Sequence, residues 1–195
     1  MDALFAHLEH EHRTIVDVMD AFARYLDLAK GDAAKVPPAD LPRFLVFFRE
    51  YVDLVHHERE ERVLLPALTR HGFAAGTGPL AHIKEQHEHE RQLLHELWRH
   101  GFRQGGCSPD DEELQRLARA FIAFQRGHVS KEAQYLYPAA KTQLKDEKGL
   151  LLAEDTRFDA EQDAYGRRAW LERLVGELVT IYGASPEPAA PTAKS

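Results

Sequence analysis

Two histidine–glutamate pairs with the spacing HxxxE stand out in the sequence, His57 with Glu61 and His128 with Glu132. In each pair the imidazole and the carboxylate fall about one turn apart on the same face of an α-helix. The second pair continues an apolar row that steps by three and four residues: Leu114, Leu117, Phe121 and Phe124. A row of the same kind leads to the first pair, so both pairs are predicted to point inward from two different helices.

Two further apolar rows each contain a single histidine. His12 continues the row of Leu8, Ile15, Met19, Phe22 and Leu26, and His87 continues the row of Leu80, Ile83 and Leu94. Four histidines and two glutamates are therefore expected to converge on one cavity. Imidazole and carboxylate without a thiolate suit iron, manganese or zinc, and zinc usually prefers closed tetrahedral sites. We predict two iron ions with an oxo or hydroxo bridge, with manganese and zinc as alternatives.

Each of these residues has an ordinary explanation when it is taken alone. A histidine in an apolar row is more often a hydrogen-bonded core residue, and one HxxxE pair is often a surface ion pair. All six together are harder to explain without a metal, because buried imidazoles and carboxylates cost kilocalories each unless they are fully paired.

Two neighbouring features leave a choice open. His56 and Glu60 form a second HxxxE pair in the next register, about 100° around an α-helix from the first, and are predicted to lie beside the site or on the surface. Arg91 lies one turn after His87. It either points into the cavity or extends past the apolar row to a surface glutamate.

Four fragments of the chain resemble the hemerythrin-like (HHE cation-binding) domain family: EHEHRTI, HHEREERVLLP, IKEQHEHERQL and GHVSKEAQYLYP. The resemblance covers roughly residues 4–141. It implies an all-α, up-down four-helix bundle that holds a non-haem di-iron site with both glutamates bridging. The residues that match the family's ligands are His12, His57, Glu61, His87, His128 and Glu132. Oxygen-carrying members use a fifth histidine where this chain has Arg91.

The resemblance implies three kinds of function. We favour a protein that binds or senses a small diatomic ligand, oxygen or nitric oxide, because the sequence contains no flavin or nicotinamide fingerprint and no electron-transfer domain. The first alternative is a di-iron redox enzyme of the peroxidase, nitric oxide reductase or iron-sulfur cluster repair type, for which peroxide is a further candidate ligand. The second is an iron-responsive interaction module.

Composition limits the number of domains, the partners and the cellular location that are expected for the protein. The chain has 195 residues, which fits one domain, and 32 acidic against 25 basic residues give a formal net charge of −7. The basic residues are interspersed, which argues against a nucleic acid or an anionic membrane as partner. One cysteine and no secretory or membrane-spanning run favour a cytoplasmic location.

Periodicity and helix-breaking residues divide the chain into a bundle and an extension. Four helices are predicted over about residues 2–29, 40–70, 80–102 and 110–145, and they form a hemerythrin-like bundle over residues 1–146. A fifth amphipathic helix, continuous over about residues 155–182 within a segment 147–183, is expected to pack on the bundle or to form a homodimer contact. Residues 184–195 are predicted to be a disordered tail.

Overall fold

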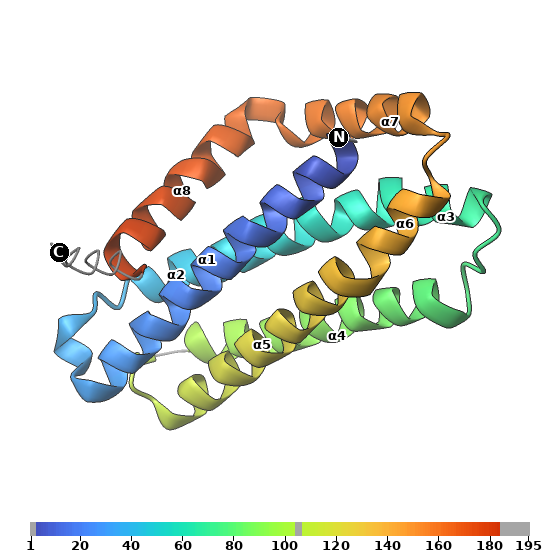
Figure 1. Cartoon of the computed structure of the whole chain (residues 1–195). Helices are drawn as coiled ribbons and strands as arrows, with labels where there is room; N and C mark the ends of the chain where they lie inside the picture. Colours follow the sequence, from blue (N-terminus) through green and yellow to red (C-terminus); the bar gives the residue numbers. More distant parts are fainter. Residues whose placement is uncertain (1–2, 104–106, 184–195) are drawn as a thin grey trace, which may run out of the picture.

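The computed structural model describes residues 3–103 and 107–183, and these residues contain helices but no strand (Figure 1). The predicted tail, residues 184–195, lies outside the described residues. The bundle consists of α1 (Ala3–Gly31), α2 (Asp40–Phe47), η2 (Phe48–His57), η3 (Glu60–Leu64), α3 (Leu65–Arg70), α4 (Gly78–Gly101), α5 (Glu112–Lys131), η4 (Glu132–Leu136) and α6 (Tyr137–Gln143). The short 3₁₀ turn η1 (Ala33–Lys35) follows α1. The all-α, hemerythrin-like bundle predicted from the sequence is confirmed.

These elements form four long helices. The segments α2, η2, η3 and α3 run on without a break from Asp40 to Arg70, and α5, η4 and α6 run on from Glu112 to Gln143. The helix that starts with α5 is capped by the Asp111 carboxylate, which accepts a hydrogen bond from the Leu114 amide at 3.0 Å. Figure 1 shows the four helices side by side along the bundle.

Three segments of the bundle, η2, η3 and η4, are π-helical. Their backbone hydrogen bonds join residues five apart, for example from the Leu65 amide to the Glu60 carbonyl and from the Tyr137 amide to the Glu132 carbonyl. A turn with more residues than an α-turn changes which side chains face the core. In the second helix the buried row steps by four throughout: Phe44, Phe48, Val52, His56, Glu60, Leu64 and Leu68.

The core consists of two apolar clusters separated by a polar layer. One cluster includes Phe22, Phe44, Phe48 and Phe121, and the other includes Leu4, Leu64, Leu80 and Tyr137. Each long helix contributes to both clusters and contributes buried histidine or glutamate side chains between its two contributions. The apolar clusters therefore hold the polar layer from both sides along the bundle axis.

The C-terminal extension differs from the single helix predicted over residues 155–182. It consists of α7 (Lys148–Gln162), the 3₁₀ turn η5 (Ala164–Gly166) and α8 (Arg167–Tyr182). Tyr165 and Gly166 have φ values of 66° and 72°, which ends α7 and turns the chain. Positive φ is unusual for tyrosine and readily adopted by glycine. The prediction of one continuous helix was wrong at this turn.

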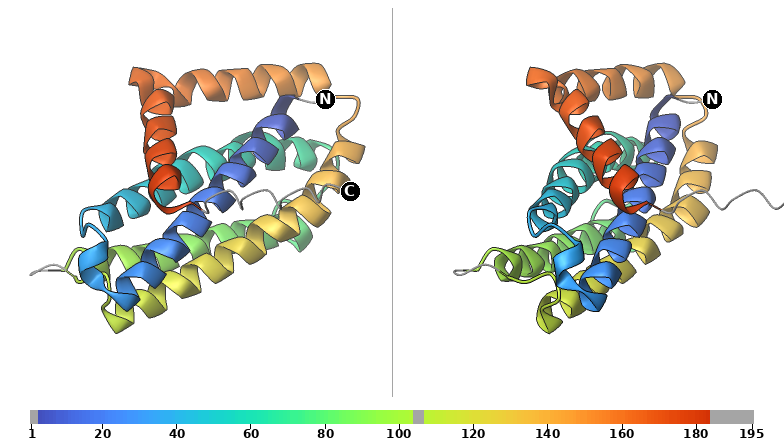
Figure 2. Two further views of the ribbon diagram at one scale, coloured as in Figure 1. Left: turned by 60° about the vertical axis from the view of Figure 1, so that its left-hand side comes forward. Right: turned by 90° about the vertical axis from the view of Figure 1, so that its left-hand side faces the viewer.

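Both C-terminal helices pack on the α1 side of the bundle (Figure 2). α7 contacts α1 and η3, and α8 contacts α1 and α2. The end of α8 is fixed by Tyr182, which donates a hydrogen bond to the buried Asp40 carboxylate at 2.5 Å and packs edge-on against Tyr25. None of the described helices is long and apolar enough to cross a membrane.

Substitution of Phe22 by alanine tests the aromatic half of the core. Phe22 is fully buried and packs on Tyr25, Phe44 and Phe48. We expect Phe22→Ala to lower the free energy of unfolding by about 3–5 kcal/mol, because it leaves a cavity. Urea denaturation followed by circular dichroism measures the change. The control Phe102→Ala removes a ring that is 46% exposed, and a loss as large as that of Phe22→Ala would contradict the expectation.

Candidate metal site

The polar layer gathers seven histidine and glutamate side chains from all four long helices, and each is at most 6% exposed. They come from α1, η2, η3, α4, α5 and η4. In chain order they are His12, His56, His57, Glu60, His87, His128 and Glu132.

Six of these side chains form two overlapping groups that could each hold a cation. The first group is His12, His56, Glu60 and Glu132, and the second is His87, His128 and the same two glutamates. Within each group the candidate ligand atoms lie within 4.8 Å of one another. We call these groups the first and second cation sites. Because they share Glu60 and Glu132, two ions held there would be bridged by two carboxylates.

Five atoms that line the two sites are buried without a hydrogen-bond partner: His56 Nε2, His87 Nε2, His128 Nε2, Glu60 Oε2 and Glu132 Oε1. Buried polar atoms are almost always paired, and an unpaired one costs about 1–3 kcal/mol. His87 Nε2 lies 3.1 Å from Glu60 Oε2 and His128 Nε2 lies 3.2 Å from Glu132 Oε1, but neither contact forms a well-aligned hydrogen bond. Cations held in the two sites would pair with all five atoms. Nitrogen and oxygen donors without sulfur fit iron, manganese or zinc.

Three histidines of the two sites are oriented by hydrogen bonds from their outer nitrogen. Each Nδ1 lies beside a carboxylate or amide oxygen, which can only accept, so Nδ1 carries the proton and Nε2 faces the layer. The acceptors are Glu11 for His56 (3.1 Å), Glu61 for His87 (2.7 Å) and Gln86 for His128 (3.1 Å).

Tyr137 belongs to the apolar cluster that contains Leu4 and Leu64, and it holds side chains of the first cation site in place. Its hydroxyl donates a hydrogen bond to Glu60 Oε1 at 2.7 Å and lies 2.9 Å from His12 Nε2, and its ring stacks on the His12 ring. Burial and the neighbouring Glu60 and Glu132 carboxylates raise the pKa of Tyr137 well above its usual value, so the hydroxyl remains a donor. Tyr135 follows Glu132 at the three-residue step of an α-helical row, but it is 70% exposed, because η4 changes the register after Glu132.

The electrostatics of the two sites differ. Burial lowers the pKa of His56 well below its usual value and also lowers the pKa of His128, so both rings are neutral. Burial also opposes a charge on His87, but Glu132, Glu60 and Glu61 outweigh it and raise its pKa well above the usual value. A cation that enters the second site must therefore displace a proton from His87.

Glu61 and Glu60 exchange the places that the sequence predicted for them. Glu61 has a side chain that is 27% exposed and belongs to neither cation site, whereas Glu60 and His56 are fully buried within the layer. The prediction assumed the 3.6-residue repeat of an α-helix, but η2 and η3 are π-helical, so positions four apart share the core face. The row of Phe44, Phe48, Val52, His56 and Glu60 was the available signal.

His57 lies in the layer as predicted, but it faces the second site rather than the first. Its ring stacks on that of His87 with centroids 4.0 Å apart, and its ligand atoms fall in a third group with His87 and His128. His57 Nε2 is also 3.3 Å from the buried Glu90 carboxylate. Both ring nitrogens of His57 are buried without a hydrogen-bond partner, so His57 is a further candidate ligand on the side of the second site, beside Glu90.

Arg91 does not point into the layer. Its guanidinium donates hydrogen bonds to Asp53 at 2.7 Å and to Glu61 at 2.9 Å, so it extends past the apolar row to carboxylates. Burial of Glu61 opposes its ionisation, but the hydrogen bonds from His87 and Arg91 hold its pKa at about 2. Glu61 therefore acts as the charged acceptor for His87 Nδ1.

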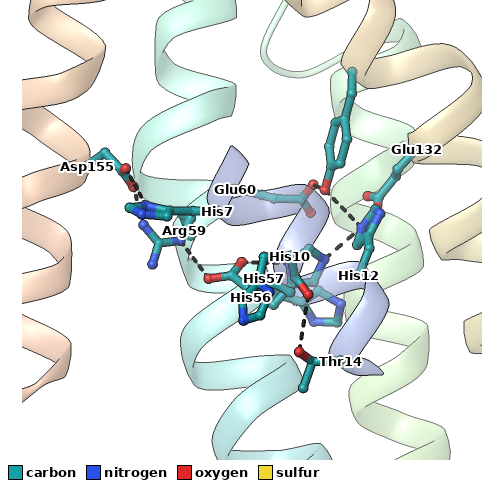
Figure 3. A network of polar contacts seen from close by, with 12 residues as sticks. His7, His10, His12, Thr14, His56, His57, Arg59, Glu60, Glu132 and Asp155 are labelled. Atoms are coloured by element: carbon teal, nitrogen blue, oxygen red, sulfur yellow. Dashed lines mark hydrogen bonds and ion pairs between the residues drawn. The ribbon is translucent and has the colours of Figure 1, made fainter. Parts of the chain in front are cut away.

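Arg59, which is buried, was not singled out from the sequence. Its Nε donates to Glu11 Oε1 at 2.8 Å, and one terminal nitrogen donates to Asp155 of α7 (Figure 3). The other terminal nitrogen donates to Asp159 of α7 at 2.5 Å. An arginine between two charged neighbours on a helix usually suggests a surface position. Its partners lie far away in the sequence, so no local pattern predicted its burial.

Comparison with known proteins agrees with this geometry. The family model described as the hemerythrin HHE cation-binding domain matches residues 2–140, which include both cation sites. Searches of the curated proteins and of the solved structures gave no match. With most of its length matched, the chain belongs to the hemerythrin HHE cation-binding domain family.

Proposed function

We propose that the polar layer holds two iron ions and that the protein binds or senses a small diatomic ligand, oxygen or nitric oxide. The observation that carries the proposal is the pair of cation sites that share Glu60 and Glu132 and contain five unpaired buried donor atoms. The donor set suits iron, with manganese and zinc as alternatives. The proposed ligands are His12, His56, Glu60, His87, His128 and Glu132.

The protein's own residues prepare the site for such a role. Two iron ions held there would supply redox chemistry and an open coordination position. Glu11, Glu61 and Gln86 fix the histidine rings, and Tyr137 fixes Glu60. The apolar clusters on both sides exclude bulk water along the bundle axis, which strengthens the electrostatic interactions inside the layer.

The second cation site is the proposed entry side for a small ligand. Glu61, Arg91 and Asp53 cover it and are all partly exposed, and a cavity of about 310 Å³ opens on Glu61. The first site is covered by Glu11 and Arg59, which are buried beneath α7. A larger cavity of about 480 Å³ reaches Glu11 and Arg59, but these two residues are buried, whereas the partly exposed Glu61 and Arg91 favour entry beside His87.

A second candidate function is an iron-responsive interaction module. It is favoured by the contacts that join His56, through Glu11 and Arg59, to the C-terminal helix α7. Through these contacts, metal occupancy could change the way α7 is presented to a partner. Hydrogen exchange in α7 with and without metal distinguishes this candidate from a site that acts on its ligand alone.

Metal analysis of two glutamine variants tests the proposed ligand set. We expect the wild-type protein to bind about two iron ions per chain, and Glu60→Gln to lose the paired site, because a bridging carboxylate is removed. The matched control Glu61→Gln changes the adjacent residue and is expected to retain both ions with weaker affinity. Retention by Glu60→Gln together with loss by Glu61→Gln would support the register predicted from sequence instead, and wild-type protein without metal would contradict the proposal.

Visible absorption spectroscopy tests ligand binding. We expect the reduced, iron-loaded protein to change its spectrum reversibly on addition of oxygen or nitric oxide, because iron held by these residues would have a coordination position for the gas. The Glu60→Gln variant is the control. An unchanged spectrum of the loaded wild-type protein with both gases would rule out the binding and sensing function.

Metal affinity should rise with pH. His87 is protonated in the metal-free layer, and its proton leaves when a cation binds. Each proton released on binding tightens the affinity about tenfold per pH unit below the histidine pKa. Competition titrations with a chelator between about pH 6 and pH 8 measure the slope, and an affinity that does not vary with pH would contradict the prediction.

A further inference from the structure

The C-terminal helix α7 lies outside the matched residues 2–140, yet it is joined to the polar layer by buried charges. We propose that α7 is a working part of the metal centre: Asp155, acting through Arg59 and Glu11, positions His56 and so holds the ion of the first cation site. This inference rests on the proposed function of the layer as a two-metal site. Glu11, Arg59 and Asp155 are positioning residues and not ligands.

The link consists of direct contacts between buried side chains. His56 Nδ1 donates to Glu11 Oε2 at 3.1 Å, and Arg59 Nε donates to Glu11 Oε1 at 2.8 Å. Arg59 also donates to Asp155, which is 1% exposed, as is Arg59 itself. His7 lies 2.7 Å from the other Asp155 oxygen. Figure 3 shows Arg59 between His56 and Asp155, so the three helices α1, η2 and α7 meet at one guanidinium.

Each member of this link needs the next one. A buried carboxylate such as Glu11 is costly unless a cation pairs with it, and a buried guanidinium is costly unless carboxylates surround it. Arg59 beside Glu11 favours the charged form of Glu11 as the acceptor for His56, and Asp155 beside Arg59 offsets the cost of burying the guanidinium. The orientation of His56 Nε2 towards the first site therefore depends on a residue of α7.

The second cation site has a comparable link that does not involve α7. His87 donates to Glu61, Arg91 donates to Glu61, and Arg91 also donates to Asp53. All of these residues belong to the bundle, and the three charged ones are between about a fifth and a third exposed. Water can replace a lost partner at this site. Weakening the α7 contact is therefore expected to affect the first site selectively.

The chain offers a matched control pair. Arg62 and Glu161 form an ion pair between η3 and α7. The buried link through Arg59 joins the same two parts of the structure, the second long helix and the C-terminal extension. Their side chains are 46% and 47% exposed and touch neither Glu11 nor His56. Glu161→Gln therefore removes a contact to α7 without touching the buried link.

Metal release separates the two sites. Asp155→Asn and Glu161→Gln are prepared in the full chain, loaded with iron(II) or cobalt(II), and mixed with excess chelator. We expect Asp155→Asn to release one of the two ions about tenfold faster than wild type while the other is released at the wild-type rate. Glu161→Gln is expected to match wild type for both ions. Asp155→Glu should restore slow release, because it keeps the carboxylate.

The visible spectrum of bound cobalt(II) reports on the ligands around each ion. A change in protein stability alone does not alter it. We expect it to change for one ion in Asp155→Asn and to be unchanged in Glu161→Gln. If Asp155→Asn does not fold, Asp159→Asn, which removes the more exposed partner of Arg59 and leaves Asp155 in place, is measured instead, and a smaller acceleration of the same single ion is expected. Wild-type release of both ions, or equal acceleration of both, would overturn the inference. Wild-type protein that binds no metal would instead overturn the proposed function.

Discussion

The structure depends on the burial of five imidazoles and two carboxylates in one layer of a helical bundle. Charged and polar groups without partners are expensive in such a place. The surrounding helices therefore supply an outer partner for several of them: Glu11, Glu61, Gln86 and Tyr137. The atoms that face one another across the layer have no such hydrogen-bond partner. For this reason the layer can accept a cation.

Much of this arrangement could be predicted where the helices are regular. His12, His87 and His128 lie in α1, α4 and α5, whose 3.6-residue repeat points them into the core as the apolar rows indicate. The structure departs from the predicted register where the backbone is π-helical. In the second helix the prediction placed Glu61 rather than Glu60 in the layer, because the hydrogen-bond pattern of η2 and η3 is not marked by residue type.

The contribution of the C-terminal extension could not be predicted from local patterns. An amphipathic helix there was predicted correctly in kind, but the turn at Tyr165 divides it, and the side chains that matter are polar ones on its buried face. From the sequence alone Asp155 would be placed on the surface, because its buried partner Arg59 lies in a distant segment of the chain. Pairings of this sort depend on tertiary contacts, and only the folded chain reveals them.

The π-helical segment η3 has a consequence for how this site tolerates changes in chain length. A π turn contains one more residue than the α turn that could replace it. Deletion of a single residue near Glu60 would leave a continuous α-helix with good backbone hydrogen bonds, and the bundle could still close around it. The side chains that follow would be rotated, and a different carboxylate or none would face the layer. The identity of the bridging residue is therefore encoded in the number of residues in this turn as well as in their types.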